Sequence, residues 1–141
     1  MSALGRILAV HQFLYERSGG WIGHRVLGGT PTLLLRTTGR RSGAVRTNAL
    51  VYARDDGDYV VVASKAGDDH APGWLHNLTA TPAVDVQLGR SRAPATARVV
   101  GHEDPDFARL WRLVNANNGD RYEAYQAKTT RQIPLVVLTP S

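Results

Sequence analysis

Three short apolar runs, separated by tight polar turns, lie close together in the chain and restrict its fold more than any other feature. The runs cover residues 32–37, 45–53 and 59–64. Gly39–Gly43 and Arg54–Asp58 separate them, and both segments are rich in residues that favour turns. Strands joined by such short connections pair with antiparallel neighbours, whereas a parallel pair needs a long crossover. The spacing therefore predicts an antiparallel meander.

The rest of the chain adds helices and further strands. The β-branched run Tyr59–Ser64 is typical of a strand that is buried on both faces. Apolar spacing predicts helices over residues 3–16, from Pro72 to about residue 80, and after Asp104-Pro105, with strands over 83–88, 93–100 and 133–138. Strict strand–helix alternation is missing, so we expect an α+β fold, mostly antiparallel, in which a barrel carries flanking helices. We interpret residues 1–141 as a single domain, with an N-terminal helix and connector over residues 1–20.

The composition excludes several classes of function. The 141 residues contain no cysteine, which rules out disulfides, thiolate metal sites and cysteine nucleophiles. The five histidines lack the paired spacing of metal ligands, so we expect no metal. A Gly-x-Ser-x-Gly elbow is absent, so the local signature of a serine hydrolase is missing. No apolar run approaches the roughly 20 residues that span a bilayer, and no signal peptide is recognisable, so we expect a cytoplasmic protein.

The net charge of +5 and the pI near 10.1 favour an anionic partner. Nucleic acid, acidic lipid headgroups and a polyanionic small molecule all fit this charge. No recognisable nucleic-acid-binding module is present, so we expect no nucleic acid partner. The amphipathic segment 3–16 leaves weak association with the inner face of a membrane open, although a helix packed on the core is the favoured interpretation.

The basic turn Gly39-Arg40-Arg41-Ser42-Gly43, followed by Arg46, is the first candidate for binding chemistry. Glycines let the backbone turn tightly and expose N–H groups, and arginine forks match phosphate or carboxylate. Two interpretations stay open from this segment alone, namely an anion pocket and a solvated hairpin turn. The segment is neither a P-loop nor a dinucleotide fingerprint.

Three further groups of polar and aromatic side chains are candidates. Ser64-Lys65 follows a buried strand, where a hydroxyl can donate to a ring carbonyl and an ammonium can neutralise an acid, but such a lysine is also a common surface cap. Trp74 stands near the start of a predicted helix and either stacks on a planar ligand or fills the core. Tyr122 and Tyr125 share one helical face, and phenols either line a quinone pocket and donate a proton or simply pack.

Taken in order, these motifs resemble the deazaflavin (F420)-dependent nitroreductase and F420H2-dependent quinone reductase family. The resemblance covers about residues 18–140 and rests on segments 33–43, 46–48, 61–67, 72–78 and 122–138. It implies a split β-barrel of the FMN-binding type, coenzyme F420 with its phosphate and oligoglutamate tail, and hydride transfer from F420H2 to a quinone-like or nitro acceptor. Two alternatives remain, namely an FMN-binding oxidoreductase of the same fold and a non-catalytic F420 carrier. Split-barrel relatives often pair, so a homodimer is a further expectation.

The resemblance also implies roles for individual positions. Tyr122 and Ser64 are the expected catalytic groups, and Tyr122 and Tyr125 face the substrate. The expected cofactor-binding residues are Arg40, Arg41 and Ser42 for the phosphate and tail; Arg46, Thr47, Asn48, Ala49, Leu50 and Val51 along the cofactor; Val62, Ala63, Ser64 and Lys65 beside the deazaflavin; and Gly73, Trp74, Leu75, His76, Asn77 and Tyr122 around the cleft. Val51 and Gly119 stand where other members can present tyrosines, which favours a smaller quinone over a bulky nitro compound.

Overall fold

A computed structural model describes residues 31–141 and contains the predicted meander. Strands β1 (Thr32–Thr38) and β2 (Val45–Val51) form a hairpin, and β3 (Ala53–Asp55) and β4 (Asp58–Val62) form the next. The single strand predicted over residues 45–53 was wrong, because the chain breaks at Tyr52. The Tyr52 N–H donates to the Pro31 carbonyl at 3.2 Å, and the chain there leaves the β1 partner and joins the β4 partner.

The remaining elements follow the predicted order, with shifted ends. They are η1 (Lys65–Gly67), α2 (Gly73–Ala80), β5 (Ala83–Leu88), β6 (Ser91–Val100), α3 (Phe107–Asn117), α4 (Arg121–Ala127) and β7 (Leu135–Pro140). Pro72 is the N-cap of α2, since its missing N–H costs nothing at a helix start. The segment around Tyr122 is a helix, so Tyr122 and Tyr125 do share an element with helical spacing. The predicted helix over residues 3–16 lies outside the described residues.

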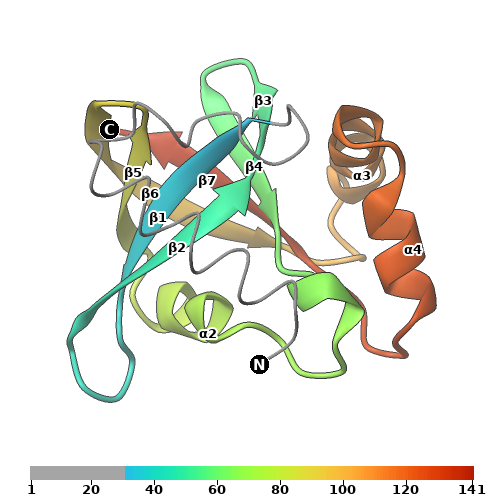
Figure 1. Cartoon of the computed structure of the whole chain (residues 1–141), viewed down its shortest axis with the longest axis horizontal. Helices are drawn as coiled ribbons and strands as arrows, with labels where there is room; N and C mark the ends of the chain where they lie inside the picture. The colour runs from blue at the N-terminus through green and yellow to red at the C-terminus, as the bar shows by residue number, and fades with distance from the viewer. Residues whose placement is uncertain (1–30) are drawn as a thin grey trace.

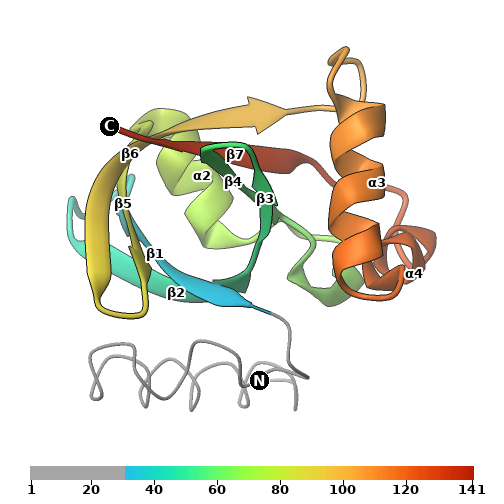
Figure 2. The ribbon, with the colours of Figure 1, turned by 90° about the horizontal axis from the view of Figure 1, so that it is seen from above.

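One antiparallel sheet contains all of these strands, in the order β2-β1-β5-β6-β7-β4-β3. The sheet curls until β2 contacts β4, which gives the half-barrel seen in Figures 1 and 2. Helix α2 lies across one end of the barrel, and α3 and α4 lie together at its side. The predicted α+β, mostly antiparallel barrel with flanking helices is confirmed.

Two hydrophobic cores meet at strand β4. Val61 faces the barrel interior, where it shares a core with Leu35 and with Trp74 of α2. Val60 faces the other way and packs with Leu110 and other side chains of α3 and α4. Both valines are at most 1% exposed, which confirms the prediction that this strand is buried on both faces. The barrel thus supplies a rigid frame, and α2 and α4 contact opposite cores of it.

None of the helices among residues 31–141 is long and apolar enough to cross a membrane.

Candidate functional site

The basic turn between β1 and β2 closes through its own backbone. The Gly39 N–H donates to the Ala44 carbonyl at 2.7 Å, and the Gly43 N–H donates to the Gly39 carbonyl at 2.8 Å. Gly43 has φ +73, a conformation that glycine adopts without the steric cost of a Cβ. The Ser42 hydroxyl accepts the Ala44 N–H at 3.1 Å. The turn is therefore shaped without its arginine side chains, which remain available for a ligand.

Asn77 of α2 holds this turn against the end of the barrel. Its Oδ1 accepts the Arg40 N–H at 3.1 Å, and its Nδ2 donates to the Thr37 hydroxyl at 3.1 Å. Asn77 is buried, with 7% of its surface exposed, and Thr37 is 2% exposed. Both bonds join segments that are far apart in the sequence. Asn77 therefore fixes the position of the basic turn through the Arg40 N–H and the Thr37 hydroxyl, and its predicted contact with a cofactor stays a prediction.

A cleft of about 380 Å³ opens between the basic turn, β2 and α2. Its lining consists of Gly39, Arg40, Arg41, Ser42, Arg46, Asn48, Gly73, Trp74 and Asn77. No carboxylate is among these residues, and within residues 31–141 no salt bridge engages its three arginines. Exposed guanidinium groups without a carboxylate partner favour a bound anion.

Trp74 takes part in both the cleft and the core. It is 5% exposed and belongs to the interior core with Leu78, yet it also lines the cleft. The core position of this tryptophan is therefore shown, and its role as a ligand platform stays a prediction. An indole fixed by core packing presents its accessible part to a ligand at little entropic cost.

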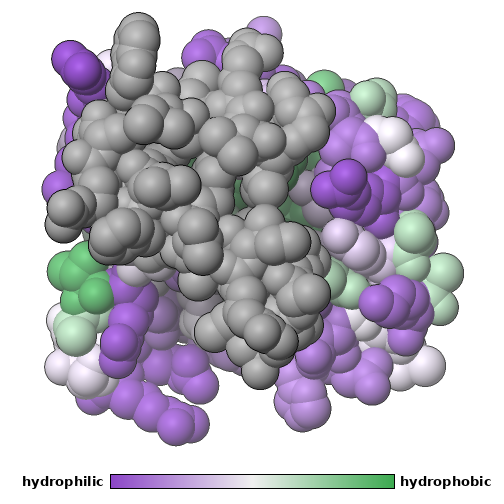
Figure 3. All heavy atoms as spheres, in the orientation of Figure 1, coloured by the Kyte–Doolittle hydropathy of each residue, from purple (hydrophilic) through white to green (hydrophobic). Residues whose placement is uncertain are grey.

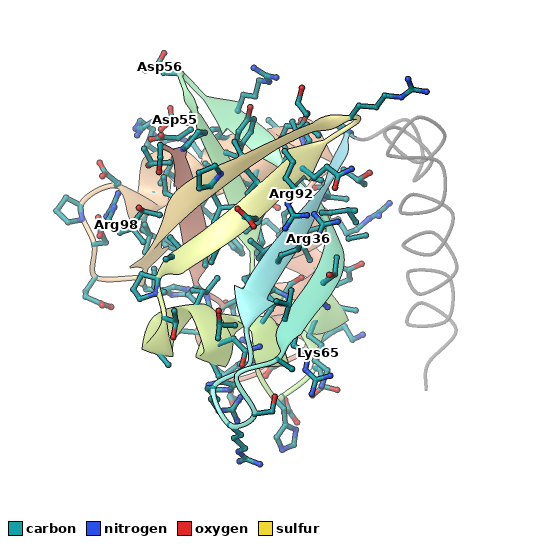
Figure 4. All side chains as sticks on the ribbon, turned by 90° about the vertical axis from the view of Figure 1, so that its left-hand side faces the viewer. Arg36, Asp55, Asp56, Lys65, Arg92 and Arg98 are labelled. Atoms are coloured by element: carbon teal, nitrogen blue, oxygen red, sulfur yellow. The ribbon has the colours of Figure 1, made fainter. Side chains whose placement is uncertain are left out.

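The β1–β2 hairpin and two acidic side chains lie toward opposite edges of the molecule. The lower left of Figure 3, where Figure 1 places the hairpin of β1 and β2, shows hydrophilic side chains beside a smaller apolar patch. Figure 4 shows Lys65 near the lower edge of the molecule and Asp55 and Asp56 near the upper edge. Arg109 donates to Asp55 at 2.8 and 3.1 Å, and this bond is the chief reason that the pKa of Asp55 lies below its usual value. Lys65 thus lies toward the lower edge, whereas the Asp55–Arg109 pair lies toward the upper edge.

Ser64 and Lys65 form the first part of a strained turn beside α4. Ser64 is 7% exposed, whereas Lys65 is exposed. Lys65, Ala66 and Gly67 have φ values of 44°, 55° and 82°, so the left-handed region is occupied at consecutive positions. A Cβ on Gly67 would lie 2.8 Å from the Tyr125 carbonyl oxygen, which ties the turn closely to α4. This turn lies on the far side of α2 from the basic turn (Figure 1).

Tyr122 lies in the second core and not on the lining of the cleft. It is 7% exposed, and its ring meets that of Tyr125 edge to face with centroids 6.2 Å apart. Burial, and next the neighbouring Tyr125, raise the pKa of Tyr122 to about 12, although Arg121 acts in the opposite direction. The phenol is therefore protonated at neutral pH, as an ordinary tyrosine is, and can donate a hydrogen bond.

The other predicted positions divide between the cleft, the cores and the surface. On β2, Asn48 lines the cleft, Ala49 is buried, Leu50 packs against the interior core, and Thr47 and Val51 are half-buried. Ala63 belongs to the interior core and Val62 to the second core, while Leu75 packs on the interior core and His76 is exposed. The structure therefore brings the basic turn together with α2, and the Ser64-Lys65 turn together with α4.

Residues 8–140 match the family model described as F420H(2)-dependent quinone reductase. The chain belongs to this family. The match spans nearly the whole sequence and therefore includes the basic turn, the cleft and both tyrosines of α4.

Similar proteins agree with this assignment. An F420H2-dependent quinone reductase of Mycobacterium tuberculosis is 50% identical over 134 residues, covering 95% of this chain and 90% of that protein. A solved structure described as an F420-H2 dependent reductase is 38% identical, with a TM-score of 0.69, and covers 77% of this chain and 93% of its own. A second, described as a domain-swapped dimer, is 35% identical, with a TM-score of 0.71, and covers 92% and 93%. The expected split β-barrel is thereby confirmed.

Proposed function

We propose that this protein binds F420H2 and catalyses its oxidation by a quinone-like acceptor. The cleft between the basic turn and α2 carries the proposal. It combines three arginines that no carboxylate of residues 31–141 engages with Trp74, a buried residue that also lines the cleft. A phosphate and several carboxylates on one ligand would give these guanidinium groups partners. The 50% identical relative named as an F420H2-dependent quinone reductase supports the same reaction.

Along the lower edge, from the basic turn to Lys65, successive residues would contact successive parts of this cofactor. Arg40, Arg41 and Ser42 would hold the phosphate and the acidic tail, and charge-assisted contacts of this kind contribute about 1.5–3 kcal/mol each before entropic costs. Trp74 would border the planar part. Ser64 and Lys65, on the other side of α2, would meet the polar edge of the deazaflavin.

The protein's part in the reaction is to bind, orient and polarise. The reduced deazaflavin supplies a hydride when bound, so the chain needs neither a nucleophile nor a metal of its own. Tyr122 is the proposed donor to the acceptor oxygen, where negative charge develops, and its pKa of about 12 keeps the phenol proton in place at neutral pH. Ser64 is the second proposed donor, and Tyr125 would line the acceptor side of the pocket.

A cofactor titration tests the proposal directly. F420, FMN and NADPH are titrated in parallel, and F420H2 oxidation is then followed with menadione and with a nitroaromatic acceptor. We expect F420 to bind in preference to FMN and oxidation to accelerate with menadione. Preferential binding of FMN would show that FMN, and not F420, is the cofactor. Binding of F420 without turnover on any acceptor would show that the protein is a non-catalytic F420 carrier.

The basic turn and the Ser64-Lys65 turn are tested by removing one charge from each. A double variant, Arg41→Gln with Lys65→Gln, should bind F420 more weakly than wild type, and the difference should shrink at high salt because the contacts are ionic. The single variants R41Q and K65Q are measured as well, and Arg112→Gln, which removes one exposed arginine of α3, is the charge-matched control for each of them. Equal weakening in the control would mean that total charge, and not the turn, attracts the cofactor.

Self-association is a second property to measure. The 35% identical solved structure described as a domain-swapped dimer supports a homodimer of this chain as well. Sedimentation velocity over a range of protein concentrations should reveal a dimer, and a monomer at every concentration would contradict this expectation.

A further inference from the structure

The segment that follows α4 donates hydrogen bonds to the backbone of the Ser64–Gly67 turn. Arg131 Nη2 donates to the Ala63 carbonyl at 3.1 Å and to the Ser64 carbonyl at 2.9 Å, and Arg131 Nε donates to the Asp68 carbonyl at 2.8 Å. Lys128 Nζ adds a bond to the Ala66 carbonyl at 3.1 Å. These cations thus bind the carbonyls before, within and after the turn.

The turn needs such support because its conformation is unfavourable. Lys65 and Ala66 both have positive φ although they carry a Cβ, and each such residue is disfavoured unless its surroundings impose the conformation. Its own backbone supplies only the bonds from the Gly67 N–H to Ser64 and from the Asp68 N–H to Lys65, at 2.9 and 3.1 Å. External contacts must supply the rest.

Arg131 is suited to this task by shape and by its own anchoring. A planar guanidinium presents several donors in fixed directions, which a single ammonium cannot do. Gln126 of α4 secures the segment, because its Nε2 donates to the Arg131 carbonyl at 2.7 Å and its Oε1 accepts the Ile133 N–H at 2.9 Å. Arg131 therefore connects α4 rigidly to the turn that carries Ser64 and Lys65.

We propose that Arg131 is a positioning residue of the F420 site, which holds the left-handed turn so that Ser64 and Lys65 face the cofactor. The inference rests on the proposed function for the identity of the ligand. In this proposal Arg131 acts on the turn and not on the cofactor, because its Nε and Nη2 donate to backbone carbonyls of the turn and its flanks. It acts by keeping a binding-competent turn populated before the ligand arrives, which lowers the cost of binding.

The test compares Arg131→Gln, Arg131→Lys and the charge-matched control Arg112→Gln in the full chain. The affinity for F420 should fall roughly 10- to 30-fold in R131Q, since the turn relaxes toward right-handed conformations. R131K keeps the charge but not the fork, so it should lose nearly as much. R112Q should bind as wild type does. Saturating F420H2 should restore most of kcat in R131Q, because the defect lies in the population of the turn.

A glycine rescue separates positioning from charge and from stability. Ala66→Gly removes the Cβ that disfavours φ 55°, so it should recover much of the F420 affinity in the R131Q background and change wild type little. Failure of A66G to rescue, or unchanged affinity in R131Q with the wild type binding normally, would overturn the inference.

Hydrogen exchange of backbone amides tests whether Arg131 holds the turn, and this measurement needs no F420. In R131Q the Gly67 and Asp68 amides should exchange faster than in R112Q, because their bonds to Ser64 and Lys65 close the turn. Equal protection in the two variants would show that Arg131 does not hold the turn. Absence of F420 binding by wild type would instead overturn the proposed function and, with it, the cofactor part of the inference.

Discussion

Asn77→Ala should release the basic turn from α2 and reveal how the proposed anion site is held. Asn77 satisfies the Arg40 N–H and the Thr37 hydroxyl at 3.1 Å each. Thr37 is 2% exposed, so its hydroxyl would remain buried without this partner, at about 1–3 kcal/mol. The Arg40 N–H is only partly buried and can turn to water, at about 0.5–1.5 kcal/mol. We expect a total loss of about 2–4 kcal/mol in the free energy of unfolding.

Urea unfolding followed by tryptophan fluorescence measures this loss. The control is Thr79→Ala, which removes an exposed hydroxyl bonded to the Leu75 carbonyl of the same helix and should change stability by less than about 0.5 kcal/mol. A double-mutant cycle with Thr37→Val isolates the side-chain bond, and we expect a coupling of about 1–2 kcal/mol. Additive losses, or equal stabilities of N77A and T79A, would refute the assignment of Asn77 as the clamp of the turn.

Two further substitutions test α4 and its neighbouring turn. Tyr122→Phe should lower kcat more than F420 affinity, with Tyr125→Phe as the comparison. The pKa of Tyr122 is raised to about 12 by folding, so its stabilising contribution is full below the unfolded value of 10.0 and is lost as pH rises through about 12. Y122F should therefore lack about 2–3 kcal/mol of the alkaline loss that wild type shows in pH-dependent unfolding. Gly67→Ala places a Cβ 2.8 Å from the Tyr125 carbonyl oxygen, at a residue with φ +82. Thermal or urea unfolding should therefore show a destabilisation of about 2–4 kcal/mol. The control is Gly57→Ala, which has open space around its added Cβ and should change stability little.

The local pattern of apolar residues was sufficient to predict the burial of β4. The β-branched run that became β4 could be placed between two cores, because a strand with apolar residues on both faces needs a partner on each side. The break at Tyr52 could not be predicted, since the apolar pattern continues through it. Its cause is a barrel corner, where the Tyr52 N–H meets Pro31 and the ring meets Tyr59 at 5.4 Å between centroids.

Only part of the predicted site lies at the cleft, because Tyr122, Ser64 and Lys65 are not among its lining residues. The arginines of the basic turn and Trp74 could be named from local composition, and both line the cleft. The role of Asn77 depends on Thr37, which is 40 residues away in the sequence, and the role of Arg131 depends on Ser64, which is 67 residues away. No periodicity or spacing within one sequence links such positions. Both side chains bind groups of the protein itself, so residue type alone gave no indication of this role.

The proposed site therefore consists of two turns on either side of α2, each held by side chains that are distant in the sequence. Asn77 holds the turn proposed for the phosphate and tail, and Arg131 holds the turn proposed for the ring. If each turn recognises its own part of the cofactor, the two clamps should respond differently to a deazaflavin that lacks the phosphate and tail. R131Q should weaken binding of the truncated and the complete cofactor by the same factor. N77A should weaken binding of the complete cofactor only, and more strongly at low salt, because the lost contacts are ionic. Equal effects of N77A on both ligands would mean that the basic turn does not recognise the tail, and the direction assigned to the cofactor along the lower edge would have to be reversed.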